Sequence, residues 1–174
     1  MFDPAKFFSL EGKLGIKFKN KELLVQAFTH RSYLNEHKHL KTEHNERLEF
    51  LGDAVLELVV TEYLFNKYPD KPEGELTSFR SALVNTTTLS TTSRGLGLND
   101  FLLLSRGEAK DIGRARQYIL ANTFEALTGA IYVDQGYETA KEFISKSRTI
   151  MPANKKRDKV NILGKFIFIL CINN

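Results

Sequence analysis

The sequence predicts an all-α protein, and two observations lead to this prediction. Apolar residues recur at the three- and four-residue spacing of helices over most of residues 1–150, and no segment shows the apolar and polar alternation of a half-buried strand. Hydrophobic residues make up 42% of the 174-residue chain, which is enough for a substantial core. We therefore expect one helical domain over residues 1–150.

The first helices are indicated by their start signals. Asp3 precedes a proline, as an N-cap residue does before proline in the first helical position, and Asn20 is placed to cap a second helix. A charged, histidine-containing stretch, residues 35–44, leads into the strongest helical pattern of the chain, residues 45–67. Pro69 follows that pattern and ends the helix.

Helical patterns also continue through the second half of the expected domain. After the turn at residues 72–74 they cover residues 76–84 and 87–94, and a glycine-rich loop follows. A further helix is predicted from Tyr118 to about Asp134, and a last one after Gly136.

The composition changes after residue 150. Residues 151–174 hold five of the 25 basic and one of the 21 acidic residues, followed by an apolar run at 166–172. Residues 1–150 thus keep 20 of each and are neutral, so the net charge of +4 is no evidence of nucleic-acid binding. We interpret residues 151–174 as a basic and then apolar tail, not a second domain.

The sequence predicts a cytoplasmic protein without membrane contact. No stretch approaches the roughly 20 apolar residues of a membrane span, and the first residues lack the pattern of a signal peptide. The single cysteine, Cys171, excludes a disulfide framework and a cysteine-based zinc site.

The helix expected at residues 45–67 has an acidic face. At about 3.6 residues per turn, acids spaced i, i+3, i+7 and i+11 project from a single face of the helix. These acids are Glu46, Glu49, Asp53 and Glu57. Close carboxylates repel, so the row needs cations, water or basic partners. A solvated acidic face is the alternative interpretation, and it requires no function.

Two residues of the same helix argue against a merely solvated face. Phe50 falls on the acidic side, where a large apolar side chain indicates a partner surface. Gly52 costs about 1 kcal/mol relative to alanine inside a helix, which indicates that another element approaches closely there.

The helix expected at residues 118–134 offers a matching face. Asn122 and Glu125 are spaced i, i+3, and small residues at positions 126, 129 and 130 allow close packing. If the two helices cross face to face, their polar side chains form an oxygen-only cluster suited to Mg²⁺ or Mn²⁺. The cluster would contain Glu49, Asp53, Asn122 and Glu125. Such a site can activate water and stabilise a phosphoryl transition state.

Residues 45–56, Asn-Glu-Arg-Leu-Glu-Phe-Leu-Gly-Asp-Ala-Val-Leu, resemble the signature of the ribonuclease III family almost letter for letter. The resemblance extends to residues 29–33, 72–76, 80–84 and 119–127. It implies an all-α endonuclease domain that forms a homodimer and hydrolyses both strands of double-stranded RNA with Mg²⁺, which Mn²⁺ can replace. It also implies 5′-phosphate and 3′-hydroxyl ends, short 3′ overhangs, and a part in ribosomal and messenger RNA processing.

By motif position, the resemblance implies metal ligands at Glu49, Asp53, Asn122 and Glu125. Asp53 and Glu125 would be the catalytic residues, with Asp53 most closely tied to the catalytic ion and its water. Asn122 departs from the aspartate of many family members. An amide keeps one carbonyl oxygen for a metal but removes a negative charge.

The resemblance also implies roles outside this set. Asn45, Glu46 and Glu73 would lie near the substrate or a second metal ion. Phe50 would be a dimer contact that inserts into a socket on the other subunit, which agrees with its place on the acidic side.

Other functions remain open from the sequence. One alternative is a catalytically impaired scaffold that binds RNA, and Asn122 favours it. A second reason for it is that family members commonly continue into a separate RNA-binding domain, for which residues 151–174 are too short. An all-α nucleotide pyrophosphatase also builds Mg²⁺ sites from acids on facing helices. A di-iron bundle would need two Glu-x-x-His pairs, which the chain lacks. Residual RNA contacts, or simply a solvated basic loop, are expected at Arg106, Lys110, Arg114, Arg116 and Gln117.

Overall fold

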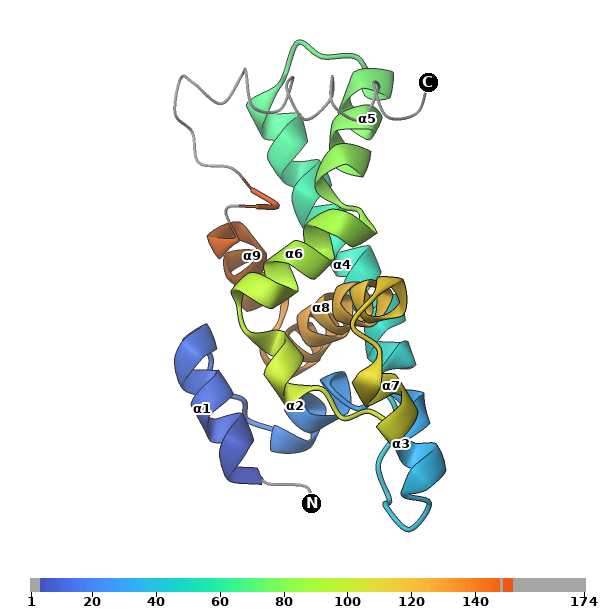
Figure 1. The fold of residues 1–174 in the computed structure, drawn as a ribbon. Helices are drawn as coiled ribbons and strands as arrows, with labels where there is room; N and C mark the ends of the chain where they lie inside the picture. The colour runs from blue at the N-terminus through green and yellow to red at the C-terminus, as the bar shows by residue number, and fades with distance from the viewer. Residues whose placement is uncertain (1–3, 148, 152–174) are drawn as a thin grey trace.

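Two long helices form the centre of the molecule in a computed structural model that describes residues 4–147 and 149–151. Helix α4 spans Glu46–Lys67 and helix α8 spans Arg114–Gln135. The two cross each other, and their contact is the most extensive between any two described elements (Figure 1). Most of α8 is buried, because α2, α4, α6 and α9 pack around it.

Glycines bring the two helix backbones into direct contact at the crossing. A side chain on Gly52 of α4 would overlap the main-chain carbonyl oxygen of Glu125, and one on Gly129 of α8 would overlap that of Leu48. The neighbouring Ala126 and Ala130 are completely buried. The close approach expected from Gly52 and from the small residues of the second helix is confirmed.

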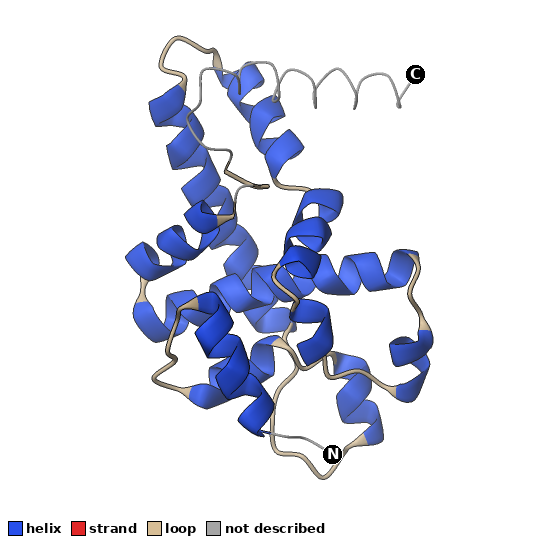
Figure 2. Ribbon diagram, turned by 60° about the vertical axis from the view of Figure 1, so that its left-hand side comes forward, coloured by secondary structure: helices blue, strands red, loops and turns tan. Residues whose placement is uncertain are grey.

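The other described elements are short helices arranged around this pair. They are α1 (Pro4–Leu14), α2 (Lys21–Ala27), α3 (Arg31–Glu36), α5 (Glu73–Leu83), α6 (Thr86–Gly95), the 3-10 turn η1 (Leu98–Phe101), α7 (Arg106–Lys110) and α9 (Tyr137–Lys146). Within the described ranges there is no strand, only an isolated bridge between Thr29 and Leu103 (Figure 2). The all-α prediction is confirmed.

Polar side chains fix the start of α2. The side chain of Asn20 accepts a hydrogen bond from the Glu22 amide at 2.9 Å, as predicted for an N-cap. The carboxylate of Asp134 accepts from the amides of Lys19 and Asn20, both at 2.8 Å, and so ties the start of α2 to the end of α8. α4 ends at Lys67, two residues before Pro69, as expected.

Two sequence expectations lie outside the described residues: the N-cap at Asp3 and the tail at residues 152–174. The helix expected after Asp3 does begin at the proline, since α1 starts at Pro4. Across the described part of the chain, no helix combines the length and the apolar character needed to cross a membrane.

Candidate active site at the crossing of α4 and α8

Three carboxylates gather where the two long helices cross. Glu49 and Asp53 lie on successive turns of α4, and Glu125 lies on α8, with its main chain against Gly52. Burial, and then the charges of Asp53 and Glu49, raise the pKa of Glu125 to about 8. This electrostatic coupling places the three side chains in one cluster.

The other two carboxyls of the cluster are perturbed in the same direction. Burial is the main reason that the pKa of Glu49 is raised, and the charges of Glu46 and Asp53 add to it. Burial, followed by the charge of Glu57, raises the pKa of Asp53. A hydrogen bond from the side chain of Asn122 to Glu49 acts the other way and stabilises the Glu49 carboxylate. The structure thus brings together the four residues that the sequence paired.

Within residues 4–147 and 149–151, no basic side chain forms an ion pair with this carboxylate cluster. Among the ion pairs of the described residues, none involves Glu49, Asp53 or Glu125. Within the same part of the chain, no three His, Cys, Asp or Glu side chains already converge as ligands on one point. The donors are all hard oxygen atoms on two helices in contact, with uncompensated charge, and this chemistry fits a divalent cation such as Mg²⁺.

We expect the metal-free protein to become less stable as pH rises from 7 to 9, because of Glu125. The pKa of Glu125 is about 8 in the folded protein and 4.5 for an unperturbed glutamate, the value used for the unfolded chain. The folded state therefore holds the proton more tightly. The resulting stabilisation is full below about pH 4.5 and is lost as pH rises through 8. Each pKa unit corresponds to about 1.4 kcal/mol, and partial exposure reduces the expected loss to about 1 kcal/mol over this window.

Urea unfolding in the presence of EDTA at pH 7, 8 and 9 measures this loss. Glu125→Gln keeps the shape of the side chain but cannot titrate, so its free energy of unfolding should change less with pH. Equal pH dependence in the parent and in E125Q would contradict the assignment.

The two residues before the cluster differ in their surroundings. Glu46 is half exposed, with Arg31 Nη1 at 3.7 Å and His44 Nδ1 at 3.8 Å. Asn45 is buried, and its side-chain amide donates to the Ala27 carbonyl oxygen at 3.2 Å. The Asn45 side chain thus holds the end of α2 against the start of α4, and its place near the substrate or a second metal ion stays a prediction.

Glu73 does not join the cluster within one chain. It is exposed at the start of α5, where its carboxylate accepts a hydrogen bond from Thr77 at 2.8 Å. From Asp53 to the end of α4 at Lys67, 14 residues rise about 21 Å, and Glu73 follows beyond that end. The sequence motif contained no information on this separation.

Phe50 is 82% exposed on α4, as its place on the acidic side indicated. Leu58 and Phe65 on the same helix are also exposed, at 56% and 69%. A groove of about 620 Å³ lies beside Phe50, which forms part of its wall. Leu51 and Val133 contribute further apolar surface to this groove. This part of α4 is therefore an apolar surface beside a groove.

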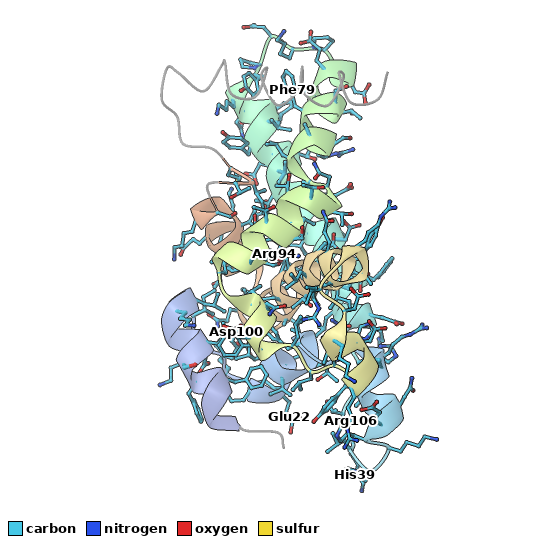
Figure 3. The ribbon with its side chains drawn as sticks, viewed as in Figure 1. Glu22, His39, Phe79, Arg94, Asp100 and Arg106 are labelled. Carbon is cyan, nitrogen blue, oxygen red and sulfur yellow. The ribbon has the colours of Figure 1, made fainter. Side chains whose placement is uncertain are left out.

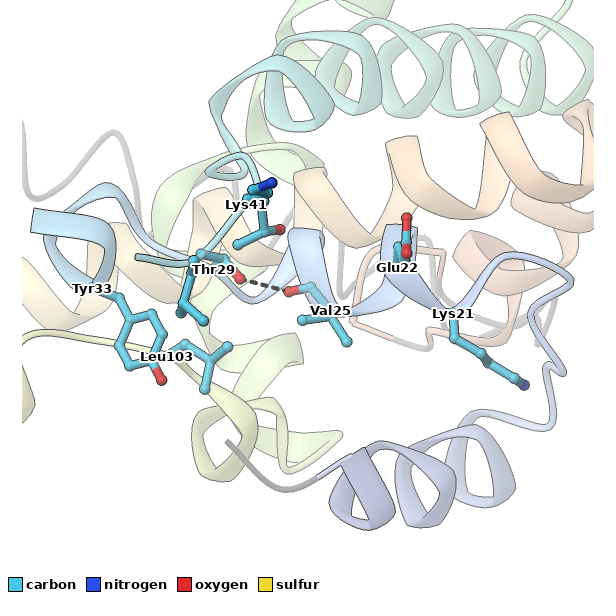
Figure 4. A pocket seen from close by; sticks show the side chains of 9 residues that line it. Lys21, Glu22, Val25, Thr29, Tyr33, Lys41 and Leu103 are labelled. Carbon is cyan, nitrogen blue, oxygen red and sulfur yellow. Dashed lines mark hydrogen bonds between the residues drawn. The ribbon is translucent and has the colours of Figure 1, made fainter. Parts of the chain in front are cut away.

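A second hollow of about 350 Å³ lies away from the carboxylate cluster, beside α2 and α3 (Figure 4). Val25, Tyr33 and Leu103 form apolar walls, and Lys21 lies at the edge. None of the residues expected in the site lines it.

The basic residues near α7 and α8 have different roles. Arg116 is buried, and its guanidinium donates to Asn99 Oδ1 at 2.9 Å and to the Glu108 carbonyl oxygen at 2.7 Å. The expectation of an RNA contact at Arg116 is therefore corrected, since this side chain holds α7 and η1 in place. Arg106 is exposed at the end of the molecule that also carries His39 (Figure 3).

The chain resembles known nucleases in sequence and in structure. A family model described as ribonuclease-III-like matches residues 20–153. A ribonuclease 3 of Geobacillus kaustophilus is 50% identical over 143 residues, which are 82% of this chain and 58% of that protein. The chain thus spans less than two thirds of that relative's length.

Solved structures give the same result for the fold. The nuclease domain of ribonuclease III from Campylobacter jejuni superposes with a TM-score of 0.75 at 41% identity, over 85% of this chain and 97% of that one. A second structure of that domain, described in terms of flexibility in a region involved in dimer formation, gives a TM-score of 0.71 at 44% identity over 81% and 93% of the two chains.

Proposed function

Since the chain belongs to the ribonuclease III family, we propose that it is a metal-dependent endonuclease that hydrolyses double-stranded RNA at the carboxylate cluster of α4 and α8. The observation that supports this most directly is the cluster of three carboxyl groups, Glu49, Asp53 and Glu125, which has no basic partner among the described residues and lies at a backbone-to-backbone helix crossing. The family match over residues 20–153 supports assigning residues 1–150 to one nuclease domain.

The family is generally metal-dependent, and Mg²⁺, with Mn²⁺ as a substitute, is the ion that we propose for this chain. Glu49, Asp53 and Glu125 would hold it, together with the side-chain oxygen of Asn122. A bound divalent ion lowers the pKa of its water and stabilises charge on a phosphate group.

The residues of the cluster contribute through charge and proton affinity. Glu125 holds a proton at neutral pH without the ion, because its pKa is about 8, and must release it to act as a ligand. Asn122 keeps the Glu49 carboxylate oriented through its hydrogen bond. Asp53 is the least buried of the three carboxyls, which leaves it accessible to the phosphodiester.

We propose that the active form is a homodimer. The groove of about 620 Å³ begins beside Phe50, so a two-fold axis near this residue would let each Phe50 enter the groove of the other copy. The exposed Leu58 and Phe65 extend the apolar surface along the same helix. Glu73 lies too far along the chain to serve its own cluster, so it would act near the substrate on a second copy.

The proposed substrate is duplex RNA in a cytoplasmic setting, with ribosomal and messenger RNA precursors as the class to be processed. In Mg²⁺ the parent protein should cut both strands of an end-labelled perfect RNA duplex, leave 5′-phosphate ends, and stop when EDTA is added. Single-stranded RNA of the same sequence is the matched substrate control.

Two results would overturn this proposal. A folded protein that binds the duplex but cuts nothing in Mg²⁺ or Mn²⁺ would be an RNA-binding scaffold. A protein that hydrolyses free nucleoside triphosphates in preference to the duplex would be a pyrophosphatase.

A further inference from the structure

One face of α8 carries more than the two site residues. At about 100° per residue, Arg114, Tyr118, Asn122 and Glu125 all lie within about 80° of one another around the helix. Tyr118 is one turn, about 6 Å, from Asn122 towards the helix start, and Arg114 is one turn further. From the carboxylate cluster towards the start of α8, the same face therefore carries first an aromatic and then a basic side chain.

Arg114 and Tyr118 are in contact with each other, and neither side chain forms an ion pair or a hydrogen bond with another of the described residues. The guanidinium carbon of Arg114 lies 5.9 Å from the centre of the Tyr118 ring, within the range of a cation–π contact. Tyr118 is 47% exposed, a large fraction for an aromatic side chain. Among the ion pairs of the described residues none includes Arg114. The buried Arg116, two positions later, differs because its guanidinium donates hydrogen bonds to Asn99 and to the Glu108 carbonyl oxygen.

The surrounding charge explains why an unpaired arginine at this place matters. The cluster itself is acidic, and residues 1–150 have no net positive charge, so a polyanionic strand needs a local cation beside the site. An arginine held against an aromatic ring loses less conformational freedom on binding a phosphate than a free one. About 12 Å separates Arg114 from Asn122 along the helix.

We propose that Arg114, held against the ring of Tyr118, binds a backbone phosphate near the cleaved bond on the RNA strand that enters the cluster. The proposal rests on the proposed nuclease function, and it assigns Tyr118 a positioning role that acts through Arg114. The Tyr118 ring, not its hydroxyl group, is the part that this role requires.

Duplex binding without metal tests the proposal separately from catalysis. The affinity of the full chain for a labelled perfect RNA duplex is measured in EDTA from low to moderate salt. We expect R114Q and Y118A each to weaken binding about 3- to 10-fold and to reduce the slope of log affinity against log salt by about one. Y118F keeps the ring and should bind within about twofold of the parent.

A double-mutant cycle and a distant lysine complete the experiment. The double variant R114Q/Y118A should bind no more weakly than R114Q, because Tyr118 acts through the arginine. Lys17 is exposed and its carbonyl oxygen contacts Gln135, at the far end of α8, so Lys17→Gln should change neither affinity nor slope. Thermal unfolding of each variant confirms that the fold is intact.

The outcomes separate this inference from the proposed function. R114Q with the affinity and slope of the parent overturns the inference, as does additive weakening in the double variant or a parent without affinity at low salt. A parent whose binding depends on Arg114 but that does not cut in Mg²⁺ overturns only the nuclease proposal. A parent that cuts, with binding independent of Arg114, overturns only the inference.

Discussion

Asp53→Asn should reduce the rate of Mg²⁺-dependent duplex cleavage by at least about 100-fold, while the protein stays folded. The substitution keeps the size of the side chain and removes one charge from the least buried carboxylate of the cluster. Loss of one group that stabilises a charged transition state commonly costs a factor of about 100 to 1,000, or about 3 to 4 kcal/mol. Single-turnover cleavage of the labelled duplex measures the effect.

Stability gives this experiment a second readout. Asp53 raises the pKa of both Glu49 and Glu125, which means that the three carboxylates repel in the metal-free protein. D53N should therefore unfold at the same temperature as the parent or slightly higher in EDTA, and added Mg²⁺ should stabilise it less than the parent.

The matched control removes a carboxylate elsewhere. Glu142 on α9 is exposed and, among the described residues, pairs only with Lys146, at 4.0 Å, so E142Q should cut at the rate of the parent. Cleavage by D53N within threefold of the parent would remove Asp53 from the catalytic machinery.

The composition of the cluster could be predicted because helical spacing is local. Glu49 and Asp53 share a face by their separation of four residues, and Asn122 and Glu125 by three, whatever the rest of the fold does. The meeting of the two faces followed from Gly52, whose cost inside a helix requires a close neighbour.

Burial and long-range placement could not be predicted in the same way. Asn45 sits inside the signature, yet its contact with the Ala27 carbonyl oxygen depends on how α2 packs, which no spacing rule describes. Arg116 looked like a surface cation because its neighbours in sequence are polar, but α7 and η1 fold over it. Glu73 follows a helix of 22 residues whose direction carries it away from the cluster.

The sequence did not predict helix boundaries correctly where apolar residues do not recur at the helical spacing. α8 begins at Arg114, four residues before the predicted start at Tyr118, because its first turn is polar and exposed apart from Arg116. The unpredicted α3 and α7 have six and five residues, too few to show a period of about 3.6. The side chain of His30 accepts from the Ser32 amide and so provides the cap of α3, in a residue type uncommon at that position.

Gly52→Ala should lower the free energy of unfolding by about 3 kcal/mol or more. The added methyl group would overlap the main-chain carbonyl of Glu125, and a backbone cannot move aside as a flexible side chain can. Relief requires α4 and α8 to separate, so the carboxylate cluster would open and duplex cleavage would fall as well. Urea unfolding of the metal-free protein measures the first effect, and the Mg²⁺ concentration for half-maximal cleavage measures the second.

The same substitution at another helical glycine should have the opposite sign. Gly12 lies within α1, and a methyl group there would meet no atom within 4 Å, so G12A should stabilise the protein by about 0.5 to 1 kcal/mol through helix propensity and reduced freedom of the unfolded chain. The contrast isolates the crossing, because backbone preference favours alanine at both positions and only the neighbour differs. If G52A and G12A shifted stability in the same direction, α4 and α8 would not be in backbone contact, and the shared placement of Glu49, Asp53 and Glu125 would lose its structural basis.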